Sequence, residues 1–264
     1  MDPKSKTSSE ATGSAKALVK GIALIDLLAA APQGLRLTDV VREAELPKGT
    51  VLRLLDTLLD ADLIREMDGV YRLGPRCAAW GSAFLDGLEL RSLARDLLER
   101  LVEISGETAH LGVVDGTRTL YIDKIDSPHS LRMFSRVGLR SRLYCTGLGK
   151  ALLAFSGDAL VDEVIAEGLV RLTENTITDV EELRAEMARI RRSGYSIDDV
   201  ENEEGVRCTG APVFDHNGEV VAAISVAGPI HRMTRERLAD LAPKVAEAGL
   251  ELSSRIGFAG RPGR

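Results

Sequence analysis

The chain has 264 residues, of which 44% are hydrophobic and 28% are charged. This balance excludes a disordered, collagen-like or membrane-embedded protein and is typical of a globular chain with one large or two smaller domains. Its 34 Lys and Arg residues and 40 Asp and Glu residues give a formal net charge of −6. Binding to nucleic acid would therefore depend on a local surface and not on the overall charge.

The sequence also bears on compartment and redox chemistry. It has no uncharged apolar run long enough to span a membrane, and residues 1–16 lack the apolar core of a signal peptide. Cys77, Cys145 and Cys208 are an odd number of cysteines without a C-x-x-C pair, which argues against a disulfide framework and a cysteine zinc site. We expect a cytoplasmic protein without a metal or another cofactor.

The first 74 residues predict a disordered tail and a helical domain. Residues 1–13 are small and polar and form the predicted tail. A helix is predicted over 14–31, because apolar residues recur at three- and four-residue spacing. These residues are Leu18, Ile22, Ile25 and Leu28.

Two more helices and a hairpin complete a domain over 14–74. Thr38 is a predicted N-cap for a short second helix, and Pro47 suits the first position of a third helix. The runs 63–66 and 70–73 flank an Asp-Gly pair, Asp68-Gly69, which predicts a β-hairpin. Three helices closed by a hairpin describe a winged helix-turn-helix.

The remaining chain predicts an α+β domain with a mainly antiparallel sheet. Linker helices are expected over 75–105, with an interruption near Gly87, followed by a domain over 106–257 and a flexible tail over 258–264. The predicted domain elements are a hairpin of 108–114 and 119–125, a helix opened by a Thr178-x-x-Glu181 capping box and ended by Gly194, strands over 195–200, 207–214 and 219–227, and a helix over 234–256.

The third predicted helix carries candidate DNA contacts. A recognition helix places its polar side in the major groove, and Lys48, Thr50 and Arg53 lie near the start of this helix. Arg72 in the hairpin could reach a neighbouring phosphate. The alternative is an ordinary solvated surface in a small-molecule sensor that acts through protein partners. Residues 1–75 contain ten basic and eleven acidic residues, so charge alone favours that alternative.

A second candidate site is the segment 146–150, TGLGK, which opens a predicted helix. Helix N-termini present free N–H groups that suit a carboxylate, and Gly147 and Gly149 would let a ligand approach the backbone. The spacing does not match a phosphate-binding P-loop, because Tyr144 and Ala151 stand where that motif needs Gly and Ser or Thr. The alternative is an N-cap followed by glycines that serve packing.

Enzymatic activity is not expected. Cys145 or Cys208 with one of the four histidines could form a nucleophile–base pair, but the chain has no G-x-S-x-G signature and no H-E-x-x-H metal motif. Buried free cysteines usually behave as small hydrophobic residues.

Several motifs in both halves resemble bacterial transcriptional regulators of the IclR type. They span about Ser14 to Gly257 and are 46–55, LPKGTVLRLL; 71–76, YRLGPR; 120–124, LYIDK; 143–154, LYCTGLGKALLA; 204–208, EGVRC; and 211–213, APV. The resemblance implies a winged helix-turn-helix followed by a GAF-like effector-binding domain. It also implies a homodimer through the DNA-binding half, or a dimer of dimers.

The resemblance implies two sets of site residues. Contacts to double-stranded operator DNA fall on Thr38, Lys48, Gly49, Thr50, Arg53 and Arg72. Contacts to the effector fall on Thr146, Gly147, Leu148, Asp198, Cys208 and Ser225. The chain departs from the family pattern at Gly49 and Ala227, where many members have Ser.

These sets lead to one functional hypothesis. We expect a sequence-specific repressor that responds to a small organic acid, with a carboxylate at the backbone N–H groups of Gly147 and Leu148. Hydroxyl groups of the acid would donate to an ionised Asp198. Residues 144–146 and the acidic run 198–205 also resemble members that respond to sugar acids such as 2-keto-3-deoxygluconate.

Overall fold

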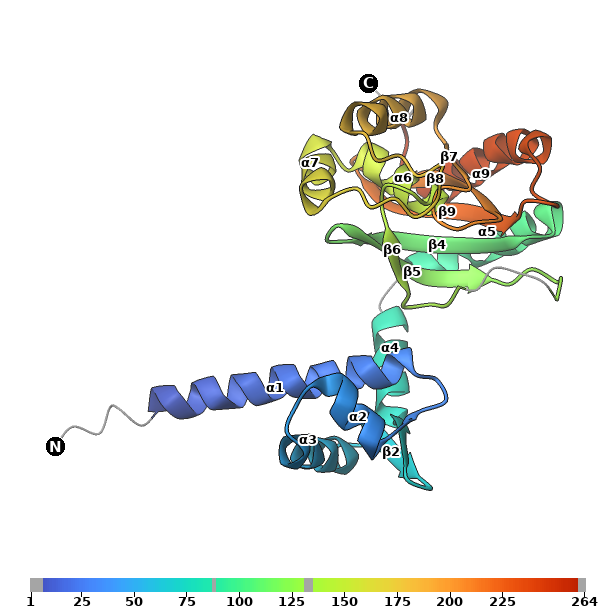
Figure 1. Cartoon of the computed structure of the whole chain (residues 1–264). Helices are drawn as coiled ribbons and strands as arrows, with labels where there is room; N and C mark the ends of the chain where they lie inside the picture. Colours follow the sequence, from blue (N-terminus) through green and yellow to red (C-terminus); the bar gives the residue numbers. More distant parts are fainter. Residues whose placement is uncertain (1–6, 87–88, 131–134, 261–264) are drawn as a thin grey trace. The chain divides into compact units, whose positions relative to one another are not determined.

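The computed structural model describes residues 7–86, 89–130 and 135–260. The chain divides into two compact units, residues 1–87 and 88–264. Each unit has its own hydrophobic core, and Figure 1 shows the elements of both. Within the described ranges, none of the helices combines the length and apolarity needed to cross a lipid bilayer.

The N-terminal unit is a winged helix-turn-helix, as predicted. Its elements are α1 Thr7–Ala30, β1 Leu35–Arg36, α2 Leu37–Ala44, α3 Lys48–Asp60, β2 Ile64–Met67, β3 Val70–Leu73 and α4 Pro75–Asp86. The strands form an antiparallel sheet in the order β1-β3-β2. Asp68 and Gly69 both have positive φ, 54° and 75°, which gives the hairpin turn that matches strand twist. The predicted hairpin is confirmed; β1 was not predicted.

Both predicted helix starts in this unit differ from the structure. Strand β1 ends at Arg36, whose extended backbone makes it the N-cap of α2. Thr38 therefore lies inside the first turn, and the prediction that it caps this helix was wrong. Pro47 is the N-cap of α3 and not its first helical residue, because its ψ of 135° is extended. Glu45 adopts φ 52° at the end of α2, so the turn between α2 and α3 is formed by residues 45–47.

Helix α1 buries only the C-terminal half of the predicted apolar face. Leu28 enters the core and Ile25 packs against it, together with Leu24, whereas Leu18 and Ile22 are exposed. The helix begins at Thr7 rather than at Ser14, and residues 1–6 of the predicted tail lie outside the described residues.

The C-terminal unit is built on one six-stranded sheet. The strands are β4 Thr108–Asp115, β5 Arg118–Ile125, β6 Arg140–Arg142, β7 Ser196–Asp199, β8 Val206–Phe214 and β9 Val220–Pro229. Their order is β6-β5-β4-β9-β8-β7, and every neighbouring pair is antiparallel. The α+β class with a mainly antiparallel sheet is thus confirmed.

Helices cover both faces of this sheet (Figure 1). They are α5 Glu89–Ser105, α6 Gly147–Phe155, α7 Asp158–Glu167, α8 Val180–Ser193 and α9 Arg235–Arg255. Gly210 of β8 lies against the backbone of Gly147 in α6, while its neighbour Ala211 lies against Gly249 in α9. Because successive strand residues point to opposite faces, α6 and α9 lie on opposite sides of the sheet. Apolar side chains of α6, α7 and α8 form one core cluster.

Most local signals in this unit match the structure. Gly194 ends α8 in the left-handed conformation, with φ 76°, and the Thr234 hydroxyl caps α9 by accepting from the Arg237 N–H at 3.2 Å. The capping residue of α8 is Asp179, which accepts from the Glu182 N–H at 2.9 Å. The predicted Thr178 cap was therefore wrong, since the Thr178 hydroxyl instead accepts from Arg171.

Three features of this unit were not predicted. They are β6, α7 and the packing of Phe258, whose ring centroid lies 5.3 Å from that of Phe214. The tail expected to begin at residue 258 thus starts with an anchored ring, and residues 261–264 lie outside the described residues. The predicted linker region contains two helices, α4 in the N-terminal unit and α5 in the C-terminal unit. Residues 87–88 between them, which include the expected interruption at Gly87, lie outside the described residues.

Candidate functional site

The first turns of α3 present the candidate DNA surface. Val51, Leu55 and Leu58 of this helix are buried in the core of the N-terminal unit. The 3.6-residue period then places Lys48 and Arg53 on the exposed side. Gly49 is exposed as well, and Thr50 is half-buried. In the part of the chain that the structure describes, no ion pair occupies Lys48 or Arg53.

The other two predicted contacts lie on neighbouring elements. Thr38 is exposed in the first turn of α2. Arg72 of β3 is half-buried, and its Nε donates to the Gln33 carbonyl at 3.0 Å, so part of its guanidinium also holds the sheet to the preceding segment. Asp56 and Asp60 are exposed on α3 and place negative charge on the helix that carries Arg53.

The six predicted effector residues come together in the C-terminal unit, where all of them are buried. Asp198 of β7 pairs with Cys208 of β8, which pairs with Ala227 of β9. Ser225 of β9 pairs with Gly210, the residue that lies against the start of α6. Three strands and one helix terminus therefore meet at this place.

The start of α6 has the geometry expected of an anion site. The Thr146 hydroxyl accepts from the Gly149 N–H at 2.9 Å, and the Thr146 carbonyl accepts from the Lys150 N–H at 2.8 Å. The N–H groups of Gly147 and Leu148 face the sulfur of Cys208 together with the Ser225 hydroxyl. Burial nevertheless raises the pKa of the Cys208 thiol to about 12. A ligand that uses these N–H groups has to displace a neutral thiol.

Asp198 is the titratable group of this site at neutral pH. Burial, and secondly the charge of Glu201, raise the pKa of its carboxyl to about 7. The Glu201 N–H donates to Asp198 Oδ1 at 2.7 Å, which opposes part of that rise. The hypothesis of an ionised Asp198 that only accepts hydrogen bonds therefore needs correction. Near neutral pH a large fraction of this carboxyl is protonated and can also donate.

Two residues that the sequence hypothesis did not include line the same face of the sheet. His110 pairs with Ser225 across β4 and β9, and its ring packs edge-on against Tyr121 at 5.2 Å between centroids. Burial, with the charge of Lys124, lowers the pKa of His110 to about 3, and burial raises the pKa of Tyr121 to about 12. Both are neutral at pH 7. Strand register, which places His110 beside Ser225, was not available from sequence.

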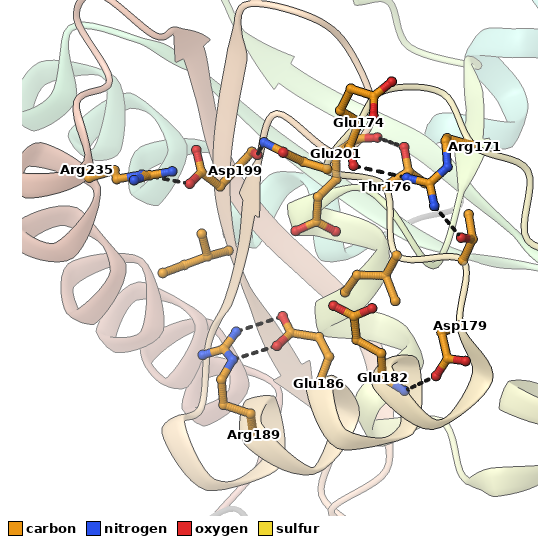
Figure 2. A pocket seen from close by; sticks show the side chains of 14 residues that line it. Arg171, Glu174, Thr176, Asp179, Glu182, Glu186, Arg189, Asp199, Glu201 and Arg235 are labelled. Atoms are coloured by element: carbon orange, nitrogen blue, oxygen red, sulfur yellow. Dashed lines mark hydrogen bonds and ion pairs between the residues drawn. The ribbon is translucent and has the colours of Figure 1, made fainter.

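A separate cavity of about 830 Å³ lies beside this site and shares none of the six predicted residues. Figure 2 shows its lining side chains, which come from the 171–179 segment, α8, β7, the turn after β7 and α9. Behind it, the buried ammonium of Lys150 contacts Glu186 at 3.0 Å and Glu201 at 2.5 Å.

Two family models cover most of the chain. The IclR helix-turn-helix domain matches residues 17–67, and the bacterial transcriptional regulator IclR C-terminal domain matches residues 82–254. The chain belongs to the IclR family. This identification confirms the resemblance and the fold, and it agrees with the expectation of a regulator rather than an enzyme, since IclR-family proteins are transcriptional regulators.

Individual members of the IclR family align over nearly the whole chain. The HTH-type transcriptional regulator BhcR of Paracoccus denitrificans is 38% identical over 92% of this chain and 88% of its own length. The transcriptional repressor IclR of Escherichia coli is 32% identical over 94% and 92%. An IclR homolog from Microbacterium hydrocarbonoxydans, solved in complex with 4-hydroxybenzoate, is 25% identical with a TM-score of 0.79, covering 91% of this chain and 98% of that one.

Two cysteines of this IclR-family chain, Cys145 and Cys208, are buried. Burial raises the pKa of Cys145 to about 12, as it does for Cys208, so neither thiol is activated as a nucleophile. Among the described residues, His, Cys, Asp and Glu side chains nowhere gather in a group of three that could hold a metal ion.

Proposed function

We propose that this IclR-family chain is a sequence-specific repressor of transcription, and that a small organic acid controls its affinity for operator DNA. The observation that carries the DNA half is the exposed surface of Lys48 and Arg53 at the start of α3, next to a hairpin that can contact the backbone. The relative from Escherichia coli is named a transcriptional repressor, which supports repression of transcription rather than activation.

Each predicted DNA residue has a role that its position supports. Arg53 and Lys48 reach base edges and phosphates from the exposed side of α3, with Thr50 beside them. Gly49, which lacks a hydroxyl, contributes its backbone N–H. Thr38 at the start of α2 and Arg72 in the wing contact phosphates on either side.

Substitution of Arg53 tests the DNA half. The wild-type chain selects its operator from a random DNA pool, and gel shifts then compare Arg53→Ala with Lys244→Ala, which removes an exposed cation from α9. We expect Arg53→Ala to weaken specific binding by about 1–3 kcal/mol, in other words about 5- to 150-fold, with an unchanged far-UV circular dichroism spectrum, and Lys244→Ala to bind normally. Wild-type affinity of Arg53→Ala would overturn the assignment. Failure of the wild type to select any DNA would favour a sensor that acts through protein partners.

The effector half rests on the six buried residues around the start of α6. We propose that the carboxylate of the effector takes the place of the Cys208 thiol at the N–H groups of Gly147 and Leu148. Hydroxyl or oxo groups then meet Asp198 and Ser225, while Thr146 keeps the helix terminus capped. The homolog solved with 4-hydroxybenzoate supports a ligand that combines a carboxylate with a hydroxyl. A sugar acid such as 2-keto-3-deoxygluconate has the same two groups.

A screen of organic acids tests the effector half. Thermal shift with hydroxy- and oxo-acids, including 2-keto-3-deoxygluconate and 4-hydroxybenzoate, should give a stabilising hit, since a ligand that binds the folded state raises its stability. Ser225→Ala should reduce the thermal stabilisation by that acid, and Ala227→Ser should preserve or increase it. The acid should change operator affinity by about 5- to 150-fold. If no acid in the panel binds, this half of the proposal is overturned.

We further propose that the chain assembles as a homodimer, or a dimer of dimers, through the N-terminal unit. Leu18, Val19 and Ile22 form an exposed apolar stripe on α1, with exposed fractions of 66%, 67% and 49%, and contiguous exposed apolar surface favours association. Ile22→Glu should lower the sedimentation coefficient at a given concentration, while Leu250→Glu on α9 should not. An unchanged assembly in Ile22→Glu would contradict this interface.

A further inference from the structure

The cavity of about 830 Å³ in Figure 2, which we call the acidic pocket, lies at the free edge of the sheet beside β7. Six carboxylates and three guanidinium groups line it. The carboxylates belong to Glu174, Asp179, Glu182, Glu186, Asp199 and Glu201, and the guanidinium groups to Arg171, Arg189 and Arg235. The lining is therefore net negative, and it has no residue in common with the proposed effector site.

The cations of the acidic pocket are already engaged. Arg189 holds both oxygens of Glu186 at 2.7 and 2.9 Å, and Arg235 contacts Asp199 at 2.9 Å. Arg171 donates to the Glu174 carbonyl and the Thr178 hydroxyl at 3.0 and 2.9 Å. These contacts leave four of the six carboxylates without an arginine partner among the lining residues, namely Glu174, Asp179, Glu182 and Glu201.

Glu201 provides the decisive observation. Its side chain is only 9% exposed, and Oε1 contacts Lys150, but Oε2 is shielded from solvent and has no hydrogen-bond partner in the described part of the chain. In Figure 2 this side chain projects into the acidic pocket toward Glu182 and Glu186. A buried carboxylate oxygen without a partner is unfavourable, so this atom needs a donor that the chain itself does not supply.

Protection of the sheet edge does not account for this arrangement. Charged side chains along a free edge strand such as β7 prevent pairing with other chains, and exposed residues serve that purpose. Glu201 lies after β7, is buried, and keeps one carboxylate oxygen without a hydrogen-bond partner, which edge protection does not require.

We propose that the acidic pocket binds a small organic cation whose primary ammonium or guanidinium group is held between Glu201 and Glu182. The cavity is far larger than a single metal ion needs, and it lies within the 300–1,000 Å³ that small-molecule sites occupy. Ile177 and Ile197 also line it and offer apolar contact to the methylene groups of an alkyl amine. Once the Glu201 carboxylate turns toward the cavity, the ammonium supplies the missing donor to Oε2 and balances the excess negative charge.

Isothermal titration of the full chain tests this proposal with three probes of similar length. These are 1,4-diaminobutane, 4-guanidinobutylamine and the neutral 1,4-butanediol. We expect saturable binding of at least one of the two cations and none of the diol. Glu182→Gln and Glu201→Gln should each weaken the cation by about tenfold or more, because a charge-assisted hydrogen bond is lost. Glu163→Gln, which removes an exposed carboxylate from α7 outside the pocket, should bind normally.

The variants also keep the test decisive if one of them fails to fold. Glu201→Gln weakens the contact to buried Lys150, whereas Glu182 forms no side-chain ion pair within the described residues, so Glu182→Gln should fold and decides the outcome. Absence of binding by both cations at millimolar concentrations, or equal binding by wild type and Glu182→Gln, would overturn the proposal.

Sedimentation of the same samples provides another check. If Glu182→Gln changes only the assembly state and no amine binds, the pocket is a contact between copies and the proposal is wrong.

Discussion

The sulfur of Cys208 lies so close to the start of α6 that a Cβ added to Gly147 would come within 2.6 Å of it. The backbone carbonyl carbon and the Cβ of Cys208 would lie 3.2 Å from the same atom. Helix α6 can therefore approach β8 only with glycine at this position, and the two proposed anion-binding N–H groups depend on that approach.

Gly147→Ala should destabilise the C-terminal unit. The added methyl group collides with a buried side chain and with backbone, so we expect a loss of about 1–3 kcal/mol in the free energy of unfolding, measured with urea. Gly81→Ala in α4 is the matched control, because nothing lies within 4 Å of its added Cβ and alanine favours a helix by about 1 kcal/mol. Equal stability of Gly147→Ala and wild type would mean that α6 and β8 are not in close contact in solution.

Asp198→Asn should change how stability depends on pH. The pKa of Asp198 is raised from its ordinary 3.8 to about 7 in the folded chain, so the folded state retains a proton that the unfolded state releases. The stabilisation from this carboxyl is complete below its unfolded pKa and is lost as the pH rises toward 7, by at most about 1.4 kcal/mol per pH unit. The Asn variant, which cannot ionise, avoids this loss.

Thermal unfolding of both proteins from about pH 5 to about pH 8 measures the difference. The melting temperature of Asp198→Asn should exceed that of the wild type most at the upper end and least at the lower end. Asp240→Asn, which changes an exposed carboxylate on α9, should follow the wild type throughout. If the melting temperatures of Asp198→Asn and wild type differ by the same amount at every pH, Asp198 does not titrate in this range.

Lys150→Met should lower the free energy of unfolding of the C-terminal unit more than a surface substitution does. The Lys150 ammonium is 1% exposed and bridges Glu186 and Glu201. The two carboxylates hold its pKa above the ordinary value although burial alone would lower it. Removing the cation leaves buried negative charge unpaired, which typically lowers the free energy of unfolding by about 3–5 kcal/mol.

Lys244→Met in α9 serves as its control, because that lysine is exposed. The two carboxylates beside Lys150 differ. Burial opposes ionisation of both, but Glu186 has a pKa of about 2 because Arg189 also holds it, whereas the pKa of Glu201 is raised.

Denaturant unfolding measures the effect. If Lys150→Met lowers the free energy of unfolding no more than Lys244→Met does, the result would contradict a charged Lys150 in the core.

Asp56→Asn should strengthen DNA binding without changing its sequence preference. Asp56 is exposed on the helix that carries Arg53, so its carboxylate repels phosphate when α3 approaches DNA. Removal of that charge should raise affinity for operator and for unrelated DNA by similar factors, as backbone contacts carry no sequence information. Fluorescence anisotropy at several salt concentrations measures both affinities, and a gain confined to the operator would mean that Asp56 takes part in base recognition.

Sequence alone determined the features that depend on neighbouring residues. The Asp68-Gly69 turn and the glycine at the end of α8 follow from backbone preferences within a few residues. The family motifs then linked distant positions that local patterns cannot connect, and so named Asp198, Cys208 and Ser225 as parts of one site.

Only the tertiary structure decided which neighbours those residues meet. Helix α2 begins at Leu37, after Arg36 as the N-cap, and not after the predicted cap Thr38. The reason is that Leu35 pairs with Tyr71 across β1 and β3, so that the extended backbone continues to Arg36. The pKa of Asp198, the closeness of Gly147 to Cys208 and the unused oxygen of Glu201 all arise from burial and from contacts between residues far apart in the chain. Local propensity carries no information about such contacts, because their energies exist only once the sheet and α6 have packed together.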